Sequence, residues 1–272
     1  MRPRVIASTA PLLLSPVDWV LDAVAEAGFA GAELLLAHNP DTRDPARVAS
    51  LAERAGIEIP AIHGPYMLVL RRVLGRDYVA KSRASLEVAA ELGAEAMVAH
   101  GPFRWERRAL RWAAGEAADE AAELGVAFGM ENLFPLNGRR FSAVVTPDDL
   151  APFRHVVFDT SHFAVTGVDL FAAWEQLADR VVGIHVSDNF GNQRDSHAPV
   201  GAGVLPLEAF LAHVGRSGYA GTVTLELDCR PYLDTRAALV GFLRDQRERV
   251  EAMLAGTAVG PAGDEAGAMR HE

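Results

Sequence analysis

The sequence contains a single cysteine, Cys229, among 272 residues, which excludes an internal disulfide. It has no apolar run near the ~20 residues of a membrane helix, and its N-terminal apolar stretch is too short for a signal peptide. Basic residues are in deficit, with 26 Lys and Arg against 36 Asp and Glu and a net charge of −10. We therefore expect a cytoplasmic protein without membrane contact. The charge argues against nucleic acid as a partner without forbidding a local basic patch.

Half of the residues are apolar, which is ample material for one large core. Short apolar runs alternate with longer amphipathic stretches along the chain, a pattern typical of βα units around a parallel sheet. This alternation predicts eight strands, at Arg4–Ala7, Ala32–Leu36, Ile59–His63, Ala96–His100, Ala127–Glu131, His155–Asp159, Val181–His185 and Thr222–Leu227.

Eight units at roughly 32 residues each predict a (β/α)8 TIM barrel. The rival architecture is a doubly wound open sheet. However, the glycine-rich fingerprint of dinucleotide folds is missing after the first strand, where Ser8-Thr9-Ala10-Pro11 stands. No linker rich in Pro, Gly or Ser divides the chain. We therefore predict one barrel domain over residues 1–254, followed by a Gly- and Ala-rich disordered tail at 255–272.

Residues that can bind a metal ion stand at the ends of six consecutive predicted strands. In a parallel barrel these ends converge on the C-terminal rim, where such enzymes place their active sites. The loops after the sixth and seventh strands add a second set of imidazole and carboxylate groups. The nine predicted donors are His63, His100, Glu131, Asp159, His162, His185, Asp195, His197 and Glu226.

This donor set contains carboxylates and imidazoles but no thiolate, which suits Zn2+, Mn2+, Co2+ or Mg2+. The absence of cysteine ligands favours a catalytic centre over a closed structural zinc site. Nine donors are more than one ion needs. One to three ions per chain therefore stay open, as does a single ion with several substrate-binding histidines.

Several short motifs resemble the xylose-isomerase-like TIM-barrel superfamily, which contains sugar isomerases, ketose epimerases, inosose dehydratases and the endonuclease IV class of apurinic endonucleases. The resemblance covers nearly the whole chain up to about residue 250. The motifs are Ile62-His63-Gly64-Pro65-Tyr66, Met130-Glu131-Asn132, Phe158-Asp159-Thr160-Ser161-His162, Ile184-His185-Val186-Ser187-Asp188, Asp195-Ser196-His197 and Leu225-Glu226.

Similarity to the sugar isomerases and epimerases implies one divalent ion held by Glu131, Asp159, His185 and Glu226. It also implies that Glu131 and Glu226 exchange protons with the substrate carbon. The expected substrate is small and sugar-like, and its predicted binding residues are Tyr66, His162, Asp188 and Arg194. Several epimerases carry an arginine at the position of Gly191, so a close ketose 3-epimerase is not expected.

Similarity to endonuclease IV implies a different assignment of the same nine donors. One zinc would bind His63 and His100, a second would bind Asp159, His185 and Glu226 with Glu131 bridging the two, and a third would bind His162, Asp195 and His197. Two stretches lack the basic residues that face DNA in that class, Ala37–Asp41 and Ser187–Phe190.

A metal-containing barrel without catalysis is the third alternative, although a barrel does not need metal to bury its core. Among the three, the sequence favours an isomerase or epimerase. The assembly state, monomer or homo-oligomer, stays open.

Overall fold

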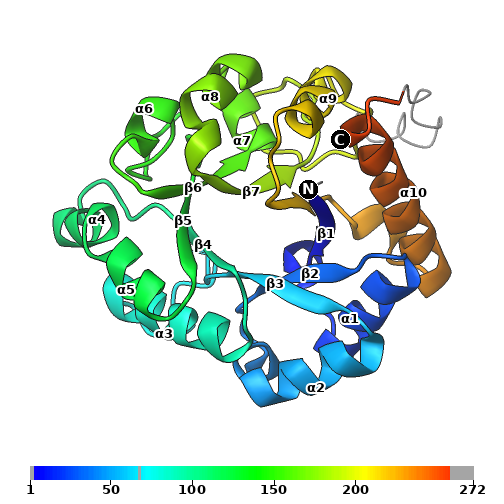
Figure 1. Ribbon diagram of the computed structural model, residues 1–272, viewed down its shortest axis with the longest axis horizontal. Helices are drawn as coiled ribbons and strands as arrows, with labels where there is room; N and C mark the ends of the chain where they lie inside the picture. Colours follow the sequence, from blue (N-terminus) through cyan, green and yellow to red (C-terminus); the bar gives the residue numbers. More distant parts are fainter. Residues whose placement is uncertain (1–2, 67–68, 258–272) are drawn as a thin grey trace.

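The computed structural model describes residues 3–66 and 69–257, and its eight parallel strands form a closed barrel (Figure 1). Each strand pairs with the next along the chain, and the ring closes where the last strand pairs with the first. The strands are β1 (Arg4–Ser8), β2 (Gly31–Leu35), β3 (Glu58–His63), β4 (Ala96–His100), β5 (Ala127–Glu131), β6 (His155–Asp159), β7 (Val181–Val186) and β8 (Thr222–Leu225).

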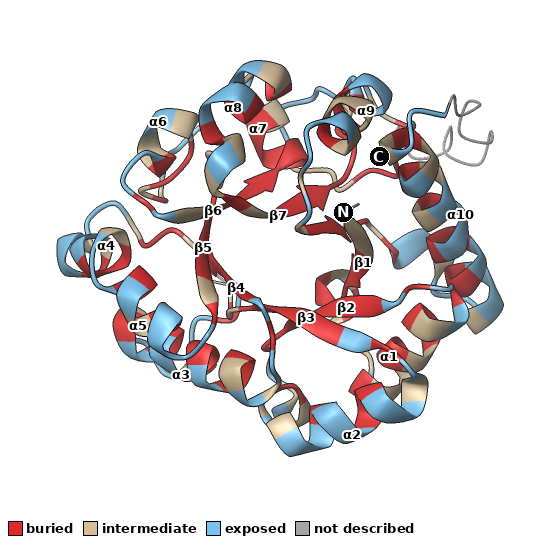
Figure 2. Cartoon of the chain, viewed as in Figure 1, coloured by how far each residue is buried: buried red, intermediate tan, exposed pale blue. Residues whose placement is uncertain are grey.

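Helices form an outer ring around these strands and turn their buried sides inward (Figures 1 and 2). The α-helices are α1 (Val17–Glu26), α2 (Pro45–Ala55), α3 (Tyr78–Glu91), α4 (Arg107–Ala114), α5 (Ala117–Glu123), α6 (Pro147–Leu150), α7 (Thr160–Thr166), α8 (Leu170–Leu177), α9 (Leu207–Arg216) and α10 (Arg236–Leu254). Short 3-10 helices are η1 (Ala10–Leu12), η2 (Pro40–Arg43), η3 (Ala178–Arg180) and η4 (Arg230–Tyr232).

The strands consist mostly of buried residues because each is covered on both faces. All five residues of β2 are buried, since one face packs against helices and the other lies inside the barrel. The register between β2 and β3 shifts between Gly31 and Glu33. Such an irregularity re-aims a side chain, and here it precedes a carboxylate, that of Glu33, buried inside the barrel.

The predicted (β/α)8 barrel is confirmed. β4, β5 and β6 have the predicted bounds, and the other strands differ by one or two residues at their ends. The largest difference is at β8, which ends at Leu225, where its pairing with β1 also ends. Beyond that point the chain turns toward the loop after β7, and the amide of Asp228 donates to the carbonyl of His197 at 2.7 Å.

The C-terminal helix α10 ends at Leu254, the last residue of the predicted barrel domain. Most of the predicted disordered tail, residues 258–272, lies outside the described residues. Within the described part of the chain, no helix has the length and apolar character needed to span a membrane.

Candidate metal centre

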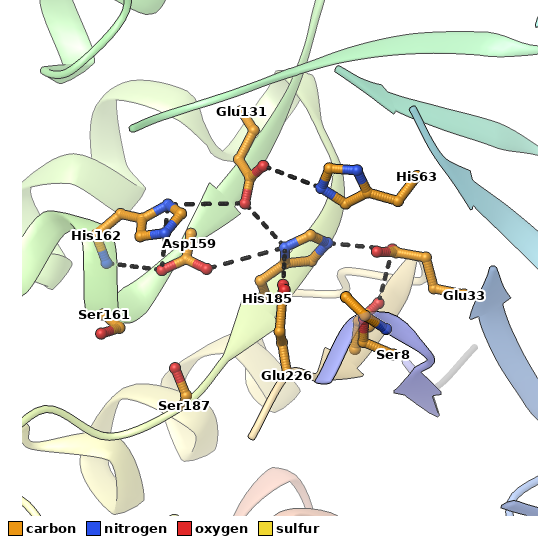
Figure 3. A network of polar contacts seen from close by, with 12 residues as sticks. Ser8, Glu33, His63, Glu131, Asp159, Ser161, His162, His185, Ser187 and Glu226 are labelled. Carbon is orange, nitrogen blue, oxygen red and sulfur yellow. Dashed lines mark hydrogen bonds and ion pairs between the residues drawn. The ribbon is translucent and has the colours of Figure 1, made fainter. Parts of the chain in front are cut away.

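The closed barrel brings all nine predicted donors to its C-terminal rim. Figure 3 labels His63, Glu131, Asp159, His162, His185 and Glu226 among them. His63, His100, Glu131 and Asp159 are the last residues of their strands, His185 is the last but one of β7, and Glu226 directly follows β8. The donors by themselves form three groups, in each of which the candidate ligand atoms lie within 4.8 Å of one another. These groups are His63, His100 and Glu131; Glu131, Asp159, His185 and Glu226; and His162, Asp195 and His197. A fourth group, which meets the same distance limit, joins His63 and His185 to Glu33.

Glu131 belongs to two of these groups and lies between them. Its Oε1 is 2.9 Å from Nδ1 of His185. Its Oε2 is 3.1 Å from Nε2 of His100 and 3.4 Å from Nε2 of His63. A carboxylate in this position could bridge two cations.

The four-donor group is centred on Nδ1 of His185. In addition to Glu131, this nitrogen lies 3.1 Å from Oε2 of Glu226 and 3.8 Å from Oδ2 of Asp159. Three carboxylates and one imidazole around one point form a donor set suited to a hard or borderline divalent cation.

The third group is formed by the loop after β7 together with the first turn of α7. Oδ2 of Asp195 lies 2.8 Å from Nε2 of His197 and 3.4 Å from Nε2 of His162. The hydroxyl of Ser161 donates to the other oxygen of Asp195 at 2.8 Å. His197 has a positive φ of 41°, an uncommon conformation for a non-glycine residue that the surrounding loop holds in place.

In three of these histidines, one ring nitrogen contacts a backbone carbonyl that does not belong to the donor groups. Nδ1 of His63 lies 2.7 Å from the carbonyl of Gly64, and Nδ1 of His162 lies 2.8 Å from the carbonyl of Asn132. Nδ1 of His197 lies 2.9 Å from the carbonyl of Glu226. Metal-ligating histidines almost always donate their second N–H in this way, which fixes the tautomer and leaves the other nitrogen for the ion.

Several buried polar atoms in the cluster lie close to one another, but within the part of the chain that the structure describes they form no hydrogen bond of good geometry. They include both carboxylate oxygens of Glu131, Oδ2 of Asp159, Nδ1 of His185 and Nε2 of His63. Unsatisfied polar atoms are rare inside proteins and call for an explanation. Because these atoms converge, bound cations would satisfy them together, so the residues present fit a metal centre.

The shifted pKa values in the cluster also support a metal centre. Burial raises the pKa of Asp159 to about 6, and the charge of Glu131 adds to that effect. Burial opposes the protonation of His197, but the carboxylate of Asp195 outweighs it and raises the pKa of this histidine to about 10. Protons thus compensate the negative charge of the cluster in the metal-free protein. Bound cations would take over that task and displace the protons.

Glu33 is a member of the cluster that the sequence analysis missed. Its side chain is 1% exposed, and Oε2 lies 3.1 Å from Nε2 of His185. It also accepts a bond from the hydroxyl of Thr224 at 3.3 Å. The available signal was a lone carboxylate within an otherwise apolar strand, because such a charge stays buried only with a partner.

A pocket of about 290 Å³ lies over the cluster, and its walls include Glu131, Glu226 and all three residues of the third group. Of the predicted substrate-binding residues, His162 and Tyr66 line it. The Tyr66 hydroxyl donates to Oε1 of Glu226 at 2.7 Å, and its ring stacks on His100 at 4.8 Å between centroids.

Asp188 and Arg194 are not among the described residues that line this pocket. The buried carboxylate of Asp188 accepts bonds from the backbone amides of Asn189, Gly201 and Leu205 at 2.8–3.0 Å, which organises the loop after β7. Arg194 is exposed on that loop. A role in substrate binding stays a prediction for both residues.

Comparison with known proteins shows to which family the chain belongs. An uncharacterized protein of Mycobacterium leprae (strain TN) is 29% identical over 252 residues, which cover 84% of this chain and 90% of the relative. The solved structure of a D-tagatose 3-epimerase-like protein superposes with a TM-score of 0.69 at 21% identity, over 92% of this chain and 98% of that one. The structure of an AP endonuclease of family 2 from Brucella melitensis gives 0.70 at 18% identity, over 88% and 98%.

At these identities the two solved structures establish a shared fold. The family model of the xylose isomerase-like TIM barrel matches residues 21–249, which include the nine donors and the seven strands from β2 to β8. The chain therefore belongs to the xylose isomerase-like TIM barrel family.

Proposed function

We propose that this chain is a divalent-metal-dependent isomerase or epimerase that acts on a small polyhydroxylated, sugar-like substrate by metal-assisted proton transfer. The observation that carries the proposal is a pair of carboxylates beside one ring nitrogen. Nδ1 of His185 lies 2.9 Å from Glu131 and 3.1 Å from Glu226. Asp159 completes a four-donor site, and this site opens into the pocket through both glutamates.

The two glutamates approach His185 from different sides, one from the end of β5 and the other from the end of β8 (Figure 3). One carboxylate can therefore take a proton from a substrate carbon while the other returns a proton to the opposite face. A bound divalent ion would polarise the substrate carbonyl and stabilise the negative charge that develops on its oxygens. The hydroxyl of Tyr66 holds Glu226 in place. His162 lines the pocket, where its ring would contact a bound substrate.

The second candidate is hydrolysis of a phosphodiester, and one observation favours it. Glu131 directs its second oxygen toward His63 and His100, while His162, Asp195 and His197 form a further group. Three adjacent groups would suit a multinuclear centre that clamps a phosphate and activates water. The structure of an AP endonuclease of family 2 shares this fold, which is compatible with the second candidate.

Metal content and solvent exchange separate the two candidates. Elemental analysis of the purified protein is expected to give near one Mn2+, Mg2+ or Co2+ per chain for the isomerase, against near three zinc for the hydrolase. Incubation with a panel of ketoses and ketose phosphates in D2O, followed by proton NMR, is expected to show deuterium entering the carbon next to the carbonyl. Cleavage of an abasic-site DNA duplex, without any such exchange, would replace the isomerase by the hydrolase.

The role of Glu226 has its own test in the variant Glu226→Gln, which keeps the shape of the side chain but cannot take up a proton. Deuterium exchange by this variant is expected to fall by about 100-fold or more. The matched control is Asp234→Asn, an exposed acidic residue farther along the same loop. Undiminished exchange by Glu226→Gln would remove the assigned proton-transfer role.

A further inference from the structure

The pocket over the metal donors has a second kind of wall. Apart from the donors and Tyr66, its described lining residues are almost all apolar: Val69, Phe103, Leu133, Phe134, Leu136 and Phe141. We call these six residues the apolar wall. Ser142 is the polar residue beside them, and its hydroxyl is already engaged with the backbone of Val144, as donor at 3.2 Å and as acceptor at 3.1 Å.

Two loops that bond to each other hold most of this wall in place. The amide of Arg104 donates to the carbonyl of Phe141, and the amide of Ala143 donates to the carbonyl of Pro102, both at 2.9 Å. An antiparallel bridge between Phe103 and Ser142 lies between them. The loops after β4 and β5 are thus joined by sheet-like hydrogen bonds, so this part of the wall is formed before any ligand binds.

Aromatic rings continue the wall from solvent down to the donors. Trp105, which is 60% exposed, stacks on Phe103 with ring centroids 4.8 Å apart and meets the edge of Phe141 at 6.4 Å. At the inner end, the ring of Phe134 lies 4.8 Å from that of His162, a member of the third donor group. A ligand held by the donors would therefore lie directly against apolar and aromatic side chains.

A compound with hydroxyls on every carbon fits this pocket poorly. Each hydroxyl placed against the apolar wall would lose its hydrogen bonds to water and find no replacement. A flat apolar group in the same place would gain from burial and from stacking. The pocket volume of about 290 Å³ leaves room for an oxygen-bearing head and roughly one ring.

We propose that the substrate has two unlike parts: a head with adjacent oxygens, which the metal donors hold, and an apolar or aromatic body, which lies on the apolar wall. This inference rests on the proposed function and narrows its substrate class from free sugars to compounds that carry an apolar substituent. The occupant is a small molecule, because the donors and the wall line one continuous pocket.

Binding of three hydroxamates to the metal-loaded full-length protein tests the proposal without requiring turnover. Each probe carries the same metal-binding head, and the probes differ in body: acetohydroxamate (methyl), phenylacetohydroxamate (aromatic) and xylonohydroxamate (polyhydroxylated). Isothermal titration is expected to show phenylacetohydroxamate binding roughly tenfold tighter than acetohydroxamate, with xylonohydroxamate no tighter than acetohydroxamate. Equal affinities, or tightest binding of the polyhydroxylated probe, would overturn the proposal.

Two leucines of nearly equal exposure give a matched pair of variants. Leu136 in the wall is 42% exposed, and Leu124 at the end of α5 is 43% exposed. Leu136→Asn is expected to reduce the preference for the phenyl probe at least threefold without changing acetohydroxamate binding, whereas Leu124→Asn leaves both unchanged. If the parent protein formed oligomers, and Leu136→Asn abolished them while leaving the phenyl preference intact, the wall would be a contact between copies of the chain.

The outcomes also separate this inference from the proposed function. A phenyl preference without deuterium exchange on any substrate would leave the pocket assignment standing and remove the isomerase. Deuterium exchange on free ketoses together with preference for the polyhydroxylated probe would support the isomerase and remove the pocket assignment.

Discussion

Glu33 and His185 form a buried carboxylate–imidazole pair beneath the metal donors. Oε2 of Glu33 accepts from Nε2 of His185 at 3.1 Å, and the two side chains are 1% and 0% exposed. With Nε2 committed as a donor, Nδ1 is left to face Glu131 and Glu226 (Figure 3). The pair therefore sets both the tautomer and the direction of an imidazole at the centre of the four-donor group.

The variant Glu33→Gln is expected to lower the metal affinity of the four-donor group by about 10–100-fold. An amide is a weaker acceptor than a carboxylate, so His185 would be held less firmly and would be a poorer ligand. Competition titration with a chelating dye measures the change. Glu58→Gln serves as the control, since that side chain is 75% exposed at the first residue of β3. Equal metal affinity in both variants would show that Glu33 only fills space.

The sequence predicted where six of the nine proposed donors lie, because these six stand at strand ends. An apolar run that ends in His or Glu shows where a strand leaves the barrel, and barrel closure then brings residues such as His63 and Glu226 together without further information. For these six residues no knowledge of the loops was needed, whereas His162, Asp195 and His197 meet only through the loop after β7 and the first turn of α7. The predicted and observed bounds of β4, β5 and β6 are identical because the apolar runs of these strands end on His100, Glu131 and Asp159 themselves.

Other parts of the site depend on contacts between distant residues. The partners of Glu33 come from β7 and β8, at sequence separations of 152 and 191 residues. Asp188 lies next to a donor strand, yet its carboxylate turns to the amides of Gly201 and Leu205. The apolar wall requires the pairing of two loops. A local pattern cannot indicate such contacts, because the loop backbone takes its shape from them.

Gly203 permits a close approach within the loop that carries Asp195 and His197. A Cβ at this position would overlap the carboxylate of Asp188 and the carbonyl of Asn189, both of which are buried. We expect Gly203→Ala to reduce the free energy of unfolding by about 1–3 kcal/mol, measured by urea denaturation. The contrasting variant is Gly241→Ala in α10, where a Cβ meets nothing within 4 Å. There, alanine is expected to raise the free energy of unfolding by roughly 0.5–1 kcal/mol. Equal effects of the two substitutions would contradict the overlap at Gly203.

Asp159→Asn is expected to have opposite effects on the metal-free and metal-loaded protein. Burial raises the pKa of Asp159 to about 6, so above that pH its ionised form opposes folding. The asparagine variant, treated with a chelator at pH 8, should therefore melt at a higher temperature than the parent protein. The parent gains about 2.7 kcal/mol from an ion at 100 times its dissociation constant. The variant should gain much less, because it lacks one donor.

Melting curves with and without added Zn2+ or Mn2+ test both effects. In the parent protein, Oδ1 of Asp159 caps the start of α7 by accepting from the amide of His162 at 2.7 Å. The side-chain oxygen of the substituted asparagine can accept the same bond, so the local helix end is preserved. A variant that matched the parent protein in both states would contradict the assignment of Asp159 as a metal ligand.

Asp149 holds the far end of the loop that forms the apolar wall. Its Oδ2 accepts from the amide of Thr146 at 2.8 Å and lies 2.7 Å from the guanidinium of Arg140. Burial opposes the ionised form, but Arg140 and Thr146 outweigh it and lower the pKa of Asp149. A carboxyl whose pKa is lowered by folding stabilises the protein above its ordinary pKa, and this contribution is lost as the pH falls through the lower folded value.

Asp149→Asn is therefore expected to reduce the free energy of unfolding by about 1 kcal/mol at pH 7. The difference from the parent protein should narrow as the pH falls below the ordinary pKa of 3.8. Urea denaturation of chelator-treated protein between pH 7 and pH 3 measures this narrowing. The matched control is Asp179→Asn, an exposed aspartate in η3, and its effect should stay small at every pH. Because Asp149 also restrains Arg140, the variant should loosen the wall and weaken phenylacetohydroxamate binding at pH 7 while leaving acetohydroxamate unchanged.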